Sequence, residues 1–431
     1  MHHAHLWGKR EVKYEWLGER SVSDSIWADL EPTAPYYLFT ERDVDLAAEY
    51  EQGWKITEAM PVNVLGFQSH RDDFAVDLDE QTLRDRMTAF RDSTFNDDEI
   101  KARFELKDNR DWQVSQARQR IRRDAGWKKN ILRCLYRPFD VRWCYFDAAA
   151  MDYPRRELLD HVAGKSNLCL NTVRQTKVAS WQHAIVTDSP APAVFVEVKD
   201  GSNLFPLYLY PTVLTGHLLS TDEHTSALGG RRPNLSANFI ADFSARLKLA
   251  FIPDGKGDRS TTFGPEDVFA YAYAIFHAPS YRHRYAEFLK IDFPRLPLTR
   301  NVDLFRQLCA LGDELVGLHL MERQGPQLPG FPYKGSAEVD KVRYSEPADG
   351  VPGRVWINAE QCFEGVAPEV WAFHVGGYQV AHKWLKDRKG RTLSHEDLTH
   401  YRRTLAALSE TIRLMAEVDE AIEAGGGWPL K

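Results

Sequence analysis

The 431-residue sequence has no apolar run of about 18 residues, which excludes a helix that crosses a membrane. Its first eight residues lack the hydrophobic stretch of a secretion signal, so we expect no export. Cysteine is scarce and no Cys-x-x-Cys pair occurs; the five positions are Cys134, Cys144, Cys169, Cys309 and Cys362. Isolated thiols in odd number are typical of reduced cysteines. We therefore expect a cytoplasmic protein that has no contact with a membrane.

The sequence also lacks the short motifs that mark catalysis. It has no GxxxxGK[ST] phosphate loop, which excludes a nucleotide-driven motor in this chain, and neither GxSxG nor HExxH occurs. The Asn/Asp-Pro-Pro-Tyr tetrapeptide with which DNA amino-methyltransferases hold a flipped base is absent as well. His2, His3 and His5 could bind a transition metal, but no residues at ligand spacing follow them. The sequence therefore predicts no catalytic residues, no metal site and no cofactor within this chain.

Apolar and aromatic residues are plentiful by contrast. They make up 43% and 12% of the sequence, with 12 Trp, which is enough for packed cores and excludes a disordered chain. The length predicts two or three domains rather than one core.

Charge is distributed unevenly, although the net charge of −7 alone argues against a nucleic-acid partner. Residues 1–100 hold 10 Lys/Arg against 22 Asp/Glu, a net of −12, whereas residues 101–200 hold 19 against 12, a net of +7. Residues 371–404 hold 7 against 3, a net of +4. This pattern fits an acidic docking end with basic binding faces. Solvated helix faces explain it equally well.

Four regions follow from proline, glycine and hydrophobic spacing, and together they predict a mixed α/β protein of the α+β class. Residues 1–60 are acidic, broken by Pro32 and Pro35, and expected to wrap another domain. Residues 61–250 form a β-rich lobe, residues 251–340 a helical region with a Gly/Pro-rich linker, and residues 341–431 a mainly helical portion.

Within these regions, particular elements are expected. Strands flank the polar segment 68–73, and a helix begins at Asp79 with Leu83, Met87 and Phe90 on one face. Residues 130–211 are β-rich, 212–232 form a mobile loop, and Ser236 starts a helix. Further helices are expected at about 111–124, 265–278, 281–289, 302–323, 369–386, 395–400 and 401–424, and a strand at 354–358.

One segment resembles a nuclease site. Glu197 and Lys199 form an ExK on an expected strand at 194–199, with Asp188 upstream. Restriction-type nucleases use such carboxylates to hold Mg²⁺ and the lysine to polarise water. The pattern is short, and a half-exposed strand whose Glu197 and Lys199 point outward is far more common.

Binding-type residues are grouped more clearly than catalytic ones. Aromatic and basic side chains recur in the blocks 135–143, 205–211, 376–379 and 383–388. Arg and Lys suit phosphates and guanine, Gln suits adenine, and aromatic rings stack on bases. Cations near a helix C-terminus also stabilise the helix dipole, so part of the last block has a structural explanation.

Taken in order, longer blocks resemble a known family. They are HLWGKREVKYEWL at 5–17, APYYLF at 34–39, YEQGWKI at 50–56, RD at 71–72, YRPFDVR at 136–142, FPLYLYP at 205–211, FHVGGYQ at 373–379, KWLKDR at 383–388 and ETIRLM at 410–415. Together they resemble the C-terminal specificity region of type ISP restriction-modification enzymes and related N6-adenine DNA methyltransferases.

The resemblance implies sequence-specific recognition of double-stranded DNA by a region that is not catalytic by itself. Methyltransferase and helicase domains, on the same polypeptide or a separate one, would lie upstream, and residues 1–60 would pack on the methyltransferase. That domain would use S-adenosylmethionine and flip the target adenine. Two alternatives stay open, which are a Mg²⁺-dependent nuclease built on Asp188, Glu197 and Lys199 and a scaffold that binds protein through residues 1–60.

Ten side chains are expected to contact DNA, because they lie near turns of the β-rich region or at the end of an expected helix. They are Arg71, Arg137, Arg142, Arg155, Arg156, Arg174, Gln175, Lys383, Lys386 and Arg388.

Overall fold

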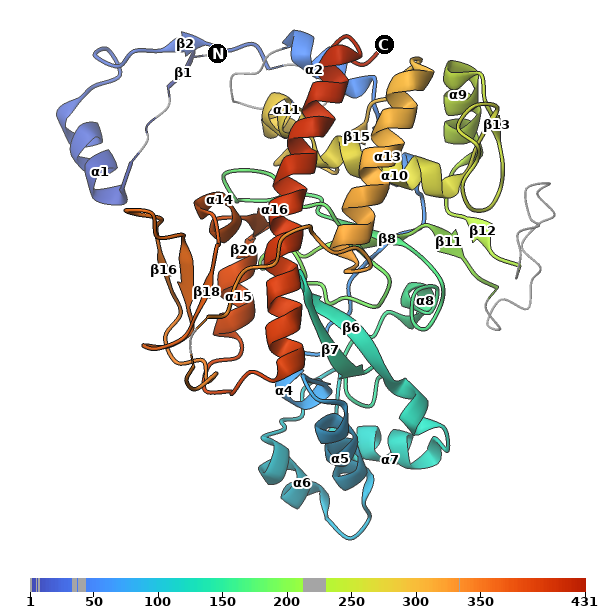
Figure 1. Cartoon of the computed structure of the whole chain (residues 1–431), viewed down its shortest axis with the longest axis vertical. Helices are drawn as coiled ribbons and strands as arrows, with labels where there is room; N and C mark the ends of the chain where they lie inside the picture. Colours follow the sequence, from blue (N-terminus) through green and yellow to red (C-terminus); the bar gives the residue numbers. More distant parts are fainter. Residues whose placement is uncertain are drawn as a thin grey trace. The chain divides into compact units, whose positions relative to one another are not determined.

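The computed structural model describes residues 2–4, 6, 8–32, 37, 44–211, 230–332 and 334–431. The chain forms two compact units, Met1–Gln52 and Gly53–Lys431, whose elements are drawn in Figure 1. Apart from 230–232, the mobile loop expected at 212–232 lies outside the described residues. None of the helices in these described ranges combines the length and the apolarity that crossing a bilayer needs.

The first unit leaves much apolar surface uncovered. It contains α1 (Arg10–Glu19), α2 (Val44–Glu51) and an antiparallel pair, β1 (His2–His3) with β2 (Ala28–Asp29). No residue of α1 is buried, so packing does not stabilise that helix. Large apolar side chains of this unit that are exposed are Val12, Tyr14, Leu17, Val22, Ile26, Trp27 and Tyr37. Such a surface is typical of a segment that docks on another protein surface.

Three small antiparallel sheets organise the second unit. The first has the order β4 (Val64–Leu65), β10 (Asn203–Pro206), β8 (Cys169–Thr172), β9 (Ile185–Thr187), and the second has the order β5 (Val76–Asp77), β7 (Asp140–Tyr145), β6 (Ile131–Arg137). The third consists of β16 (Arg343–Ser345), β17 (Arg354–Trp356) and β18 (Cys362–Glu364). The expectations of a β-rich stretch at 130–211 and a strand near 354 are therefore confirmed.

Four strand pairs complete the sheets in the described part of this unit. They are β11 (Tyr208–Leu209) with β12 (Arg232–Pro233), β13 (Ala250–Phe251) with β14 (Thr262–Phe263), β15 (Arg295–Leu296) with β3 (Trp54–Lys55), and β19 (His374–Val375) with β20 (Tyr378–Gln379).

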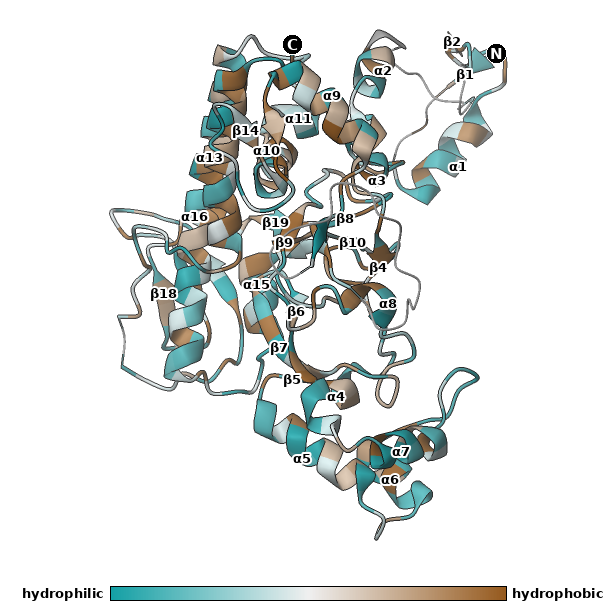
Figure 2. Ribbon diagram, turned by 90° about the vertical axis from the view of Figure 1, so that its right-hand side faces the viewer, coloured by the Kyte–Doolittle hydropathy of each residue, from teal (hydrophilic) through white to brown (hydrophobic). Residues whose placement is uncertain are grey.

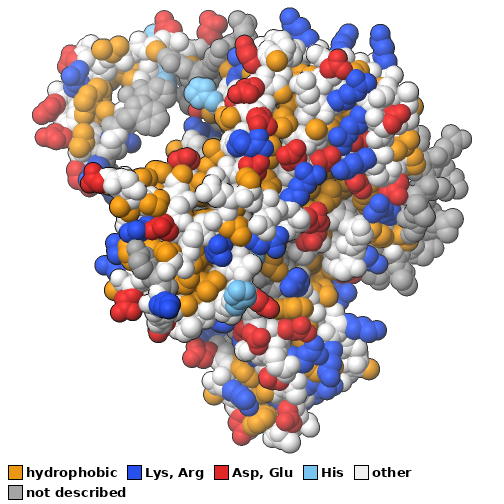
Figure 3. Space-filling view, viewed as in Figure 1, with side chains coloured by type: hydrophobic (Ala, Val, Ile, Leu, Met, Phe, Trp, Pro, Cys, Tyr) orange, Lys and Arg blue, Asp and Glu red, His pale blue; other side chains and the backbone are white. Residues whose placement is uncertain are grey.

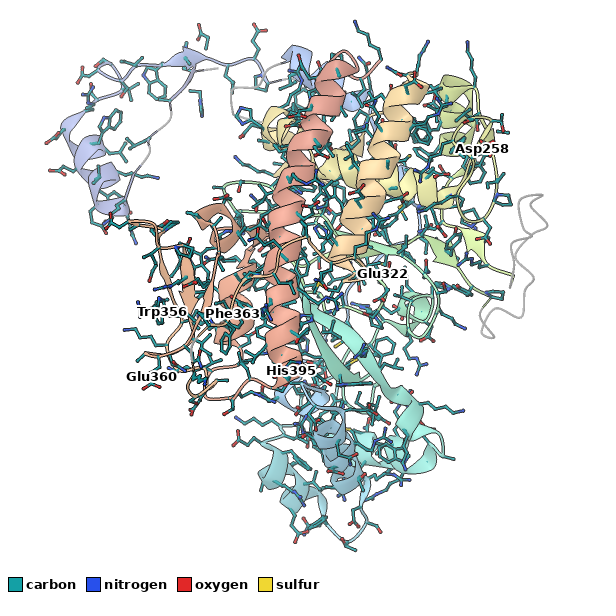
Figure 4. All side chains as sticks on the ribbon, viewed as in Figure 1. Asp258, Glu322, Trp356, Glu360, Phe363 and His395 are labelled. Carbon is teal, nitrogen blue, oxygen red and sulfur yellow. The ribbon has the colours of Figure 1, made fainter. Side chains whose placement is uncertain are left out.

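Three long helices form the main helical core. They are α10 (Pro265–His277), α13 (Val302–His319) and α16 (His395–Ala424), and apolar residues recur along α13 in Figure 2. A Cβ at Gly312 would lie 1.9 Å from the carbonyl oxygen of Ala270, so glycine is what lets α13 approach α10 this closely. Phe363 of β18 packs on Tyr401 of α16 with ring centroids 4.6 Å apart, which attaches the third sheet to the core (Figure 4).

Shorter helices surround these elements. They are α3 (Ile56–Ala59), α4 (Asp72–Ala75), α5 (Glu80–Arg91), α6 (Asp97–Phe104), α7 (Val114–Arg123), the 3₁₀ helix η1 (Trp127–Asn130), α8 (Arg156–Leu159), α9 (Ala237–Leu247), α11 (Pro279–Arg284), α12 (Ala286–Leu289), α14 (Pro368–Trp371) and α15 (Val380–Lys386).

Helix starts were predicted better than helix continuity. Asp79 caps α5 by accepting from the Thr82 amide at 2.7 Å, and Ser236 caps α9, as expected. The expected break near residue 400 is wrong, because α16 is continuous over 30 residues. The strand expected at 194–199 is also wrong, since these residues form turns and bends.

Candidate nucleic-acid interface

The structure brings two of the aromatic-basic blocks together at one buried carboxylate. Asp140, at the start of β7, accepts from Arg388 at 2.8 Å and from Arg142 at 2.7 and 2.9 Å. Arg142 also donates to Asp387 at 3.2 Å. Burial alone would raise the pKa of Asp140, but the charges and hydrogen bonds of Arg388 and Arg142 lower it below its usual value. The carboxylate is therefore ionised and joins the β6–β7 hairpin to α15.

Aromatic rings cover the guanidinium groups of this joint. Arg137 and Arg142 each lie 4.1 Å from the ring centre of Tyr136, and Arg388 lies 3.5 Å from that of Trp384. The Arg142 side chain is 14% exposed and the Arg388 side chain 5%. Both guanidinium groups are thus held inside the framework rather than presented on a surface.

Arg71 has a similar internal position. Its Nη2 donates to Asp152 at 2.5 Å and its Nη1 to the Ser69 carbonyl at 2.8 Å, while its guanidinium lies 3.8 Å from the ring centre of Trp112. Burial lowers the pKa of Arg71, and the hydrogen bond and charge of Asp152 oppose that shift. The side chain is 8% exposed.

The remaining predicted residues are more accessible. Arg155 precedes α8 with φ 55°, and Arg156 pairs with Asp160 at 3.0 Å. Arg174 is 73% exposed, and its Nε lies 3.9 Å from Asp292 Oδ1.

Gln175, Lys383 and Lys386 complete the predicted set. Gln175 donates to Asp200 at 2.9 Å, and Lys383 pairs with Asp387 at 2.5 Å. Lys386 is exposed at the end of α15. Arg174 and Lys386 are consequently the predicted residues most available to a ligand.

A basic surface around α7 was not among the predicted contacts. Four exposed cations form this α7 patch, and Figure 3 shows Lys and Arg gathered over the region where Figure 1 places α7. They are Arg123, Lys128, Lys129 and Arg133. No ion pair joins them to a carboxylate within the part of the chain that the structure describes. The sequence signal is the run of cations at 118–133, in which Asp124 is the one acidic residue.

Two arginines of the same run serve the fold instead. Arg118 is buried and donates to the carbonyls of Phe90, Asp92 and Phe95, and Arg122 donates to those of Arg91 and Asp92. The bonds to Phe90, Arg91 and Asp92 satisfy carbonyl groups at the C-terminus of α5. Sequence alone does not separate such capping arginines from exposed ones.

The expected nuclease residues are not arranged as a metal site. Glu197 is buried, accepts from the Thr176 hydroxyl at 2.7 Å and lies 3.4 Å from His183, whose pKa burial lowers to about 4. Asp188 does not lie with Glu197; it lines a cavity of about 410 Å³ together with Glu322, which is labelled in Figure 4. No cluster of three or more metal-ligating side chains occurs in the described ranges.

Comparison with known proteins identifies the fold. Among solved structures, the chain matches a DrdV–DNA complex determined by cryo-EM with a TM-score of 0.67 at 19% identity, over 94% of this chain and 42% of the other. It matches a nuclease-deletion mutant of the Type ISP restriction-modification enzyme LlaGI, in complex with a DNA substrate mimic, with a TM-score of 0.62 at 18% identity, over 98% and 38%. It matches the ATP-dependent Type ISP restriction-modification enzyme LlaBIII bound to DNA with a TM-score of 0.63 at 17% identity, over 94% of this chain and 26% of the other.

These likenesses confirm the mixed fold, and the chain spans less than half the length of each of these three solved chains. No curated protein matches the sequence. The model of the Type ISP C-terminal specificity domain matches residues 58–417, which is most of the chain. The chain therefore belongs to the family of Type ISP C-terminal specificity domains.

Proposed function

We propose that this chain recognises a specific sequence in double-stranded DNA for a restriction-modification system and performs no catalytic step by itself. The observation that carries the proposal is the match to the Type ISP C-terminal specificity domain over residues 58–417. It is supported by solved chains of similar fold that are described as bound to DNA or to a DNA mimic.

Local charge supports the same proposal. Because the net charge is −7, attraction to DNA must come from particular surfaces rather than from the whole chain. The α7 patch, Arg174 and Lys386 offer exposed cations for phosphates. The buried ion pairs of Asp140 with Arg142 and Arg388 would hold the β6–β7 hairpin in place, and this hairpin carries Arg133 of the α7 patch. Phosphate contacts position such a protein, and a smaller set of base contacts selects the sequence.

A methyltransferase part outside this chain would supply the chemistry. It would bind S-adenosylmethionine and act on an adenine that is turned out of the duplex. The exposed apolar residues of the first unit, which also carries much of the negative charge, would provide its docking surface. A helicase part of the same enzyme is a further proposed partner.

The experiment is a binding titration of labelled duplexes by fluorescence anisotropy, with the chain joined to its methyltransferase part. We expect binding that prefers one short sequence and whose log affinity falls with log salt by about 0.9 per phosphate contact. Absence of duplex binding at low salt overturns the proposal. If the chain and the methyltransferase part, prepared as separate proteins, still bind each other, the protein-binding scaffold becomes the better explanation.

A further inference from the structure

The polar segment 68–73 contains a histidine that the proposed function does not use. His70 has φ 53°, a left-handed conformation that costs a non-glycine residue about 1–2 kcal/mol. Its neighbour Gln68 exchanges two backbone hydrogen bonds with Tyr153, at 2.9 and 3.0 Å, which fixes this turn in place. Strain of this kind persists where the surrounding structure enforces it, and it gathers at functional sites.

A buried carboxylate orients the imidazole. Asp152, whose side chain is 2% exposed, accepts from Arg71 at 2.5 Å and Asn109 at 3.2 Å and lies 2.6 Å from His70 Nδ1. Burial would raise the pKa of Asp152, but hydrogen bonds from His70 and Arg71 lower it, so the group is an anion. An ionised carboxylate only accepts hydrogen bonds, which places a proton on Nδ1. The outer atom of the ring is therefore Nε2.

The ring is also accessible. The His70 side chain is 52% exposed, and its ring meets that of Tyr153 nearly edge-on, with centroids 6.0 Å apart. It borders a cavity of about 580 Å³ whose lining includes Arg103 and Lys107, both exposed. The outer nitrogen of His70 therefore lies at the edge of a cavity that is also lined by two exposed cations.

We propose that His70 is a base-reading residue, whose Nε2 makes a hydrogen bond to one base edge of the bound duplex while Arg103 and Lys107 contact its phosphates. This inference rests on the proposed function. A phosphate contact needs little more than charge, which exposed cations such as Arg103 and Lys107 supply. A base contact needs a fixed direction, and the strained backbone, the Asp152 carboxylate and the Tyr153 ring together fix that direction.

Which base His70 can recognise depends on whether its Nε2 carries a proton. With Nδ1–H held by Asp152, a neutral ring accepts at Nε2 from adenine N6 or cytosine N4. A protonated ring donates there to guanine N7 or O6. In either state, a substitution of His70 changes preference at a single base pair. A merely structural histidine would leave sequence preference unchanged.

The test uses the chain joined to its methyltransferase part and a panel of duplexes that carries each base pair at each position of the target. His70→Asn is suitable because Asn tolerates positive φ and is too short to reach the same atom. We expect discrimination between base pairs at one position of the target to fall about 5- to 30-fold. Discrimination at the other positions and the slope of log affinity against log salt should stay unchanged. His70→Gly removes the whole ring at a position whose positive φ suits glycine, and it should give the same loss of discrimination.

His283→Asn, on an exposed histidine of α11, is the matched control and should change nothing. Two results overturn the inference. One is an unchanged base preference, which leaves His70 a structural residue. The other is a uniform loss of affinity with a salt slope smaller by about 0.9, which marks a phosphate contact. Absence of duplex binding by the unsubstituted protein overturns the proposed function itself, so the two failures are distinguishable.

Discussion

Arg388 Nη2 donates a hydrogen bond of 2.8 Å to Asp140 Oδ1, although the two residues are 248 positions apart. Both side chains are nearly inaccessible, at 5% and 2% exposed. Because a buried charge is stable only when it is paired, this bond fixes α15 against the β6–β7 hairpin. The blocks 135–143 and 383–388, whose residue types are typical of nucleic-acid binding, thus contribute buried ion pairs that stabilise the fold.

Arg388→Ala should lower the free energy of unfolding by about 3–5 kcal/mol. The substitution leaves Asp140 with one cationic partner in place of two and removes the guanidinium from the face of Trp384. Urea denaturation followed by tryptophan fluorescence measures the change. Lys386→Ala, at an exposed position two residues before Arg388, should change the free energy of unfolding by less than about 0.5 kcal/mol. Equal effects of the two substitutions would contradict the assignment of Arg388 to the framework.

Neutralising the α7 patch should weaken DNA binding without loss of sequence preference. In the double variant Lys128→Ala with Lys129→Ala, we expect the slope of log affinity against log salt to fall by about 0.9 for each phosphate contact removed. Affinity for all duplexes should fall together, because phosphates carry no sequence information. Anisotropy titrations at several salt concentrations measure both quantities.

A charge-matched control comes from two other exposed lysines. Lys334→Ala with Lys341→Ala removes the same charge from the segment before β16 and should leave the slope unchanged. If both double variants alter the slope alike, the effect belongs to net charge and the α7 patch is not a DNA contact.

Local signals explain what the sequence could predict. The start of α5 was predictable because Asp79 and the apolar spacing of Leu83, Met87 and Phe90 lie within one segment. Helix α6 was missed although its capping box, Asn96 with Glu99, is a local signal of the same kind. The break placed near residue 400 was wrong because polar residues on one face of a long helix resemble a loop when tertiary contacts are unknown.

The site could be predicted only as a set of residue types. Whether an arginine faces a ligand or a buried carboxylate depends on partners far away in the chain, such as Asp152 for Arg71 and Asp140 for Arg388. Spacing along the chain holds no information on such pairs. The positive φ of His70 was equally hidden, because it is imposed by the backbone pairing of Gln68 with Tyr153.

Glu197→Ala should reduce stability, because we expect Glu197 to have a structural role and no role in DNA cleavage. The buried carboxylate accepts from Thr176 and lies beside His183, so its removal leaves polar groups unpaired at a cost of about 1–3 kcal/mol. We expect no Mg²⁺- or Mn²⁺-dependent cleavage of duplex DNA by the unsubstituted chain, measured on supercoiled plasmid. Cleavage that Glu197→Ala abolishes and Thr176→Val retains would establish the nuclease alternative.

Buried histidines should make the protein sensitive to mild acid. His319 lies between Tyr273, whose hydroxyl is 2.5 Å from Nδ1, and Thr411, whose hydroxyl is 2.9 Å from Nε2, and burial lowers the pKa of His319 to about 3. Because a histidine in the unfolded chain titrates near pH 6.5, the unfolded state binds a proton that the folded state refuses between about pH 6.5 and 3.

The free energy of unfolding should therefore fall as pH falls through that window, by up to about 1.4 kcal/mol per pH unit for each such histidine. Denaturant titrations between pH 7 and pH 4 measure the slope. His319→Gln should lower stability at pH 7, because the contact with Tyr273 is lost. It should also reduce the slope of the free energy of unfolding against pH by up to about 1.4 kcal/mol per pH unit, which corresponds to one proton. Thr411→Val removes the other hydrogen bond of the same ring but keeps the titrating group, so it should lower stability and preserve the slope. If His319→Gln also preserves the slope, the acid sensitivity does not arise from this histidine.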